Sequence, residues 1–101
     1  MMLVRGDTMP VGVLTLEIFI PDAHSLKEKR QVLRSLKDRL RGQFNVAVAE
    51  LDHQELWQRS VVGVVTISND QRHLEQSLQN VAEESARVLG KDLVGQQIEV
   101  F

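Results

Sequence analysis

The sequence predicts an α+β domain in which two helices cover one face of a four-stranded antiparallel sheet. Three observations support this prediction. The elements follow the order βαββαβ, each helix has a single apolar stripe, and a short hairpin joins the two central strands. Together they indicate the ferredoxin-like, or split βαβ, arrangement. An open α/β sheet is the alternative, and six elements with a short hairpin in the middle disfavour it.

The strands are predicted from β-rich segments. In residues 11–20, one face is formed by Leu14, Leu16, Ile18 and Ile20. The other predicted strands are residues 44–51, 59–68 and 92–101.

The first helix is predicted to run from the capping box formed by Ser25 and Glu28 to about Arg41, with Gly42 as its C-terminal stop. Its sheet-facing arc consists of Leu26, Leu33, Leu36 and Leu40.

The second helix is predicted from about Gln71 to Leu89, with Ser68 or Asp70 as its N-cap and Gly90 at its end.

The chain of 101 residues allows one domain, which we expect at residues 9–101. Because Met9 stands directly before the first strand, residues 1–8 are predicted to be a disordered tail or the product of a mis-assigned start. No membrane segment or signal peptide is recognisable in the sequence. The absence of cysteine excludes disulfides, thiol nucleophiles and thiolate metal sites.

Positive charge is concentrated in the first helix, although the chain has a net charge of −2. Residues 25–41 carry seven basic and two acidic side chains, whereas the remainder carries five basic and twelve acidic ones. Five of the basic residues recur at spacings of 3, 4, 3 and 4 and occupy an arc of about 80°. We call these residues the basic stripe: Lys27, Arg30, Arg34, Lys37 and Arg41.

Like charges at this spacing repel one another, so the basic stripe requires an anionic partner or acidic neighbours. The phosphate backbone of RNA would provide regularly spaced negative charge. The alternative is a solvated stripe that is balanced by Glu75, Glu83 and Glu84 of the second helix. The helix macrodipole also favours basic residues near the C-terminal end, so both interpretations stay open.

Three further residues are candidates for a ligand site or an interface. Lys29 falls in the middle of the apolar arc, where its stem should pack while its ammonium reaches out at the end of the sheet. A ligand carboxylate or phosphate could bind there. Trp57 is the only tryptophan and is predicted either to fill a local gap in the core or to anchor an interface. Arg59 follows it at the start of the third strand.

No catalytic or cofactor-binding pattern is recognisable. No glycine-rich phosphate loop is present, and we expect no enzyme activity and no small-molecule cofactor. His24 and His53 are predicted at one end of the sheet, where a metal site or an acid–base pair is conceivable. Acidic residues lie near them in the sequence: Asp22, Asp52 and Glu55. Ordinary loop polarity explains the same residues.

The third strand is apolar on both faces, with Val62 and Val64 on one and Val61, Val65 and Ile67 on the other. Helices cover only one face of this fold, so the second face needs another cover. We therefore expect a homodimer that packs the uncovered sheet faces together or continues the sheet through an edge strand. The alternative is a central strand that is flanked by longer polar neighbours.

Four separated blocks resemble the YlxP-like family of small uncharacterised bacterial proteins. They are HSLKEKR (24–30), FNVAVAE (44–50), LWQR (56–59) and SND (68–70) followed by His73. The resemblance covers residues 9–101 and implies a ferredoxin-like fold in a bacterial cytoplasmic protein. It supplies no catalytic residue, and a role in RNA or ribosome binding is only suggested for the family.

The sequence as a whole predicts a non-enzymatic, dimeric domain that binds RNA or the ribosome through the basic stripe. The alternative is a homodimeric structural or protein-interaction module without nucleic-acid contact. A third interpretation is a small-ligand sensor or an enzyme that uses the end of the sheet at His24 and His53.

Overall fold

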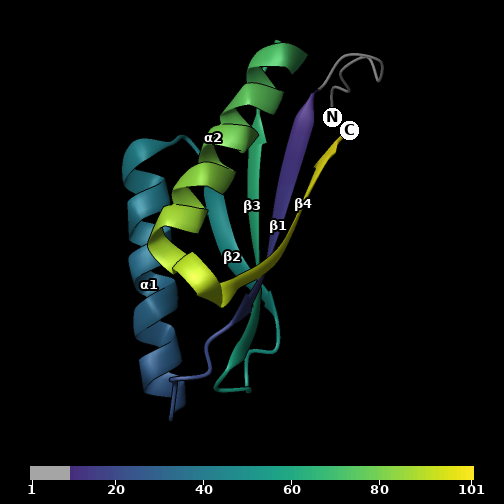
Figure 1. The fold of residues 1–101 in the computed structure, drawn as a ribbon. Helices are drawn as coiled ribbons and strands as arrows, with labels where there is room; N and C mark the ends of the chain where they lie inside the picture. Colours follow the sequence, from purple (N-terminus) through teal and green to yellow (C-terminus); the bar gives the residue numbers. More distant parts are fainter. Residues whose placement is uncertain (1–9) are drawn as a thin grey trace, which may run out of the picture.

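Two helices pack on one face of a four-stranded antiparallel sheet in the computed structural model, which describes residues 10–101 (Figure 1). The elements in chain order are β1 (Val11–Phe19), α1 (Leu26–Gln43), β2 (Ala47–Asp52), β3 (Arg59–Ile67), α2 (Gln71–Leu89), the 3-10 turn η1 (Gly90–Asp92) and β4 (Leu93–Val100). The strand order is β2-β3-β1-β4, and every neighbouring pair is antiparallel. The predicted ferredoxin-like arrangement is confirmed. The tail predicted for residues 1–8 lies outside the described residues.

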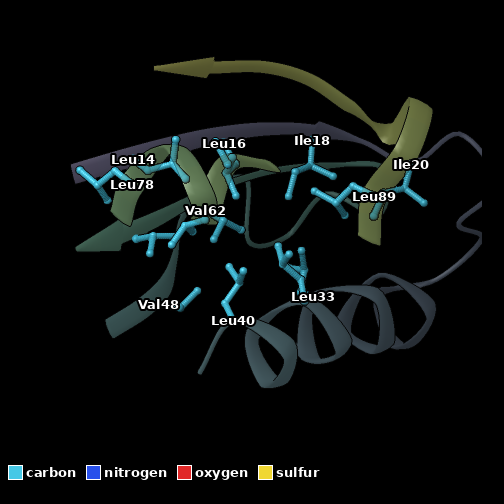
Figure 2. Packing of buried hydrophobic residues seen from close by; sticks show 14 of the residues in the cluster. Leu14, Leu16, Ile18, Ile20, Leu33, Leu40, Val48, Val62, Leu78 and Leu89 are labelled. Carbon is cyan, nitrogen blue, oxygen red and sulfur yellow. The ribbon is translucent and has the colours of Figure 1, made fainter. Parts of the chain in front are cut away.

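The core lies between the sheet and the two helices. Alternation along β1 directs Leu14, Leu16 and Ile18 toward the helices, and all three are buried. Figure 2 shows these side chains opposite Leu33 and Leu40 of α1. The face predicted for the first strand is therefore confirmed.

Helix α1 begins as predicted but ends later. The Ser25 hydroxyl accepts a hydrogen bond from the Glu28 backbone N–H at 3.1 Å, as expected at an N-cap. The predicted stop at Gly42 is wrong, because the helix continues to Gln43 and Gly42 does not adopt a positive φ. Phe44 is the C-cap, and its backbone N–H bonds to the Leu40 carbonyl at 2.9 Å. The strand β2 begins at Ala47, whereas the sequence predicted a start at Phe44, which is instead the C-cap of the helix.

Helix α2 matches the predicted bounds. The Asp70 carboxylate accepts from the backbone N–H groups of Arg72 and His73, which makes Asp70 the N-cap. Gly90 follows the helix with a φ of 57°, a conformation that glycine adopts without a steric penalty. No helix within residues 10–101 is long and apolar enough to cross a membrane.

Candidate functional site

The basic stripe runs along α1 beside the edge strand β2. Four of its residues are exposed and Lys37 is half-buried. Arg30, Arg34 and Lys37 line a hollow of about 290 Å³ together with Leu33, Glu50 and Val62. At the end of the helix, Nη2 of Arg41 donates a hydrogen bond to the Val48 carbonyl of β2 at 3.3 Å. The stripe therefore borders the free edge of the sheet.

No side chain of the basic stripe forms an ion pair with a carboxylate of residues 10–101. The prediction that Glu84 balances the charge of the basic stripe is wrong, because this buried carboxylate binds two other arginines. Its Oε2 lies 2.9 Å from Nη1 of Arg39, and its Oε1 lies 3.1 Å from Nε of Arg87. Glu75 and Glu83 are exposed and form no ion pair in the described part of the chain. The charge of the stripe is thus uncompensated by neighbouring ion pairs.

The stripe presents its cations in a row along the helix. Lys27 and Arg41 are fourteen residues apart, which corresponds to about 21 Å along a helix. Three of the five side chains are arginines, whose planar donors can bind a phosphate in bidentate fashion. The stripe could therefore contact several phosphate groups along one strand.

Lys29 lies on the same helix but is fully buried. Its ammonium donates to Glu50 Oε2 at 2.9 Å, to the His53 carbonyl at 2.7 Å and to the Arg59 carbonyl at 3.1 Å. The prediction that the stem packs among apolar residues and reaches the end of the sheet agrees with this position. The prediction that the ammonium emerges there is wrong, because its three N–H donors are satisfied inside the protein. No donor is left for a ligand.

Glu50 and Ser60 complete this arrangement, which we call the lysine clamp (Lys29, Glu50 and Ser60). The Ser60 hydroxyl donates to Glu50 Oε2 at 2.7 Å, and Ser60 is buried. The clamp joins α1, β2 and β3 and holds both ends of the β2–β3 loop. Sequence reasoning missed Glu50 and Ser60, although Glu50 stands two residues after the core residue Val48 and so faces the helices.

Trp57 lies in the loop held by the lysine clamp. Its exposed fraction is 52%, so the interpretation of Trp57 as a core residue is wrong. It lines an open hollow of about 570 Å³ with Phe19, Leu56 and Arg59. The Arg59 guanidinium lies 5.5 Å from the centroid of the Phe19 ring, within the range of a cation–π contact. The two candidates Trp57 and Arg59 therefore line the same hollow. Lys29 does not line it but holds the adjoining loop through its bonds to the His53 and Arg59 carbonyls.

The end of the sheet at His24 and His53 is a poorer candidate for a metal or acid–base site. Nδ1 of His53 lies 3.9 Å from Oδ1 of Asp52, and both side chains are partly or largely exposed. His24 is exposed in the loop before α1. Among residues 10–101, no group of three or more His, Asp or Glu side chains is arranged to hold a metal ion.

Residues 11–93 match the model of a family described as a protein of unknown function (DUF503). The chain belongs to this family. The uncharacterised protein YlxP of Bacillus subtilis (strain 168) is 39% identical over 71 residues, which cover 70% of this chain and 77% of that protein. The resemblance to YlxP-like proteins is therefore confirmed.

A solved structure illustrates the similarity of the fold. A putative antibiotic biosynthesis monooxygenase from Nitrosomonas europaea superposes with a TM-score of 0.53 at 8% identity, covering 98% of this chain and 93% of that one. This likeness concerns the fold alone. A C-terminal segment of the alpha subunit of aIF2 from Pyrococcus abyssi gives a TM-score of 0.48 at 20% identity. The match covers 91% of this chain but only 50% of the aIF2 chain, and it says nothing about what this chain binds.

Proposed function

We propose that this protein binds RNA, free or on the ribosome, through the basic stripe of α1. The observation that carries the proposal is the set of five basic side chains on one helix face without a carboxylate partner in the described part of the chain. The chain as a whole has a net charge of −2, so the concentration of positive charge on this helix face does not follow from a generally basic composition.

The positions of the acidic residues favour an external partner. Glu84 faces α1 but is bound by Arg39 and Arg87. Glu50 lines the same hollow as Arg30 and Arg34, yet its Oε2 accepts from Lys29 and Ser60. An RNA strand would supply the missing negative charge and release its counterions on binding.

The contacts are expected at the phosphate backbone rather than at the bases. Phe19 is the only aromatic residue on strands β1–β4, so the sheet offers no platform on which successive bases stack. Backbone contacts position a protein on RNA but carry little sequence information. We therefore expect binding that tolerates sequence changes and depends strongly on salt.

Fluorescence anisotropy with a labelled single-stranded RNA at several salt concentrations tests the proposal. If all five stripe residues neutralise phosphates, the slope of log K against log salt should be about −3.5. Arg30→Glu/Arg34→Glu should abolish measurable binding. Arg72→Glu/Lys91→Glu is the matched control, because its two reversals also take the net charge from −2 to −6 but affect exposed residues outside the stripe.

Equal loss of affinity in both double variants would show that overall charge matters and the stripe does not, which contradicts the proposal. A surface that docks an acidic protein would also depend on salt. Bulk RNA distinguishes the two cases, because an excess of unlabelled RNA should displace the labelled RNA from an RNA-binding stripe, whereas it should leave an acidic protein in place on a stripe that is specific for protein.

A further inference from the structure

One face of the sheet is turned away from α1 and α2 (Figure 1). This face, here called the open face, has an apolar centre. Alternation along β1, β2 and β3 places six apolar residues there: Val13, Ala47, Ala49, Leu51, Val61 and Val65. Leu51 is 58% exposed and Val65 37% exposed. Ile67, at the end of β3, is 60% exposed. The prediction that β3 is apolar on both faces is confirmed, and one of these faces has no cover within residues 10–101.

The open face contains both a hollow and protruding side chains. The hollow measures about 190 Å³, and its lining includes Val13, Ala47, Ala49 and Val65. A β-bulge in β2 between Glu50 and Asp52 directs Leu51 across Gly63, where a Cβ on the glycine would lie 2.6 Å from the leucine Cδ1. A surface with small residues beside protruding ones can fit a copy of itself across a two-fold axis.

Charged groups lie at the margins of this face. Glu17 leans over Gly95 of the edge strand β4, since a Cβ at this glycine would lie 2.7 Å from Glu17 Oε2. Arg59 stacks on Phe19 at the end of β1 and β3. An apolar centre with a polar margin is the usual anatomy of a protein–protein interface.

We propose that a second copy of this chain covers the open face, with the two sheets packed face to face. The four strands have 9, 6, 9 and 8 residues, and at about 3.3 Å per residue and 4.8 Å between strands they present roughly 500 Å² per copy. Two copies would bury about 1,000 Å², which reaches the approximately 1,000 Å² expected of a biological interface. Glu17 and Glu99 also lie on the open face, opposite Val61 and Val13, so the apolar contact centres on β2 and β3, away from these carboxylates. This inference goes beyond RNA binding and does not depend on it.

The arrangement has a consequence for the basic stripe. Because α1 packs on the opposite face of the sheet, the two stripes of a dimer would lie on its outer sides. The dimer would therefore present two separate basic surfaces, each next to a free β2 edge. Two such sites on one particle increase the apparent affinity for a partner long enough to reach both.

Light scattering on the full chain at concentrations from about 1 to 100 μM tests the dimer. We expect a mass twice that of the 11.5 kDa monomer. Val65→Lys should weaken dimerisation on the order of 100-fold, because it buries a charge at the centre of the contact. Gln79→Lys, on the exposed side of α2, adds the same charge and should leave the dimer intact. A monomeric wild-type protein at 100 μM, or a dimer insensitive to Val65→Lys, would overturn the proposal.

A second measurement decides the matter even if Val65→Lys fails to fold. The chain contains no cysteine, so Val65→Cys introduces a single thiol with little change in size. Its reaction with a maleimide should become at least tenfold slower as the protein concentration rises through the dimerisation constant. The thiol of Gln79→Cys should react at a constant rate. Equal and concentration-independent rates for both thiols would exclude a second copy from the open face.

Discussion

Replacement of Lys29 by methionine tests the account of the lysine clamp. Methionine retains the length of the stem but removes the ammonium, which makes three hydrogen bonds of 2.7–3.1 Å to Glu50, His53 and Arg59. The change leaves a partly buried carboxylate and two carbonyl oxygens without their donor. Loss of one partner of a buried ion pair costs about 3–5 kcal/mol.

The expected cost lies at the lower end of this range. The Glu50 side chain keeps 19% of its exposure and its hydrogen bond from Ser60, so water and the hydroxyl recover part of the loss. We therefore expect Lys29→Met to lower the free energy of unfolding by about 3 kcal/mol. For a domain of this size, the melting temperature should fall by about 12–24 °C.

Urea denaturation followed by far-UV circular dichroism measures this effect. Lys27→Met is the matched control, because it makes the same substitution two residues away at an exposed position. We expect the control to change the free energy of unfolding by less than about 0.5 kcal/mol. A loss below about 1 kcal/mol for Lys29→Met would refute the assignment of Lys29 as a fully bonded buried cation.

Three further substitutions test the packing around the site. Glu84→Ala should cost about 1–3 kcal/mol by leaving the α1–α2 contact without its buried carboxylate, whereas Glu83→Ala at an exposed position should stay within about 0.5 kcal/mol in the same urea assay. Gly12→Val should cost about 1–3 kcal/mol, because a Cβ at this position overlaps the Leu78 side chain; a neutral result in thermal unfolding would contradict the close approach of α2 to β1. Asp70→Ala should lower the free energy of unfolding by about 1 kcal/mol through loss of the N-cap, and restoration by Asp70→Asn would identify the cap as the cause.

The elements of the fold could be predicted because local patterns determine them. The alternation Leu14, Leu16, Ile18 required a strand with one face in the core, and the cap signals at Ser25 and Asp70 marked the helix starts. The end of α1 was missed because Gly42 is tolerated inside a helix when nothing requires a left-handed residue there.

The candidate site was predicted less completely, since its long-range partners are not local features of the sequence. The position of Lys29 on the apolar arc predicted the packing of its stem, but not the burial of its ammonium or the identity of its acceptors. Two of these acceptors are backbone carbonyls, one in the β2–β3 loop and one at the start of β3, and no side-chain pattern marks them. The lack of an ion pair between the basic stripe and any carboxylate of residues 10–101 also depends on tertiary packing, because Glu84 had to be placed before its pairing with Arg39 could be seen.

Ultraviolet crosslinking of the tagged protein in bacterial cells, followed by sequencing of the attached RNA, tests the central claim most directly. The account predicts that the wild-type protein and Arg72→Glu/Lys91→Glu recover RNA well above background, while Arg30→Glu/Arg34→Glu does not. Recovery of RNA at background level by the wild-type protein, or equal recovery by Arg30→Glu/Arg34→Glu, would contradict the assignment of the basic stripe as an RNA-binding surface.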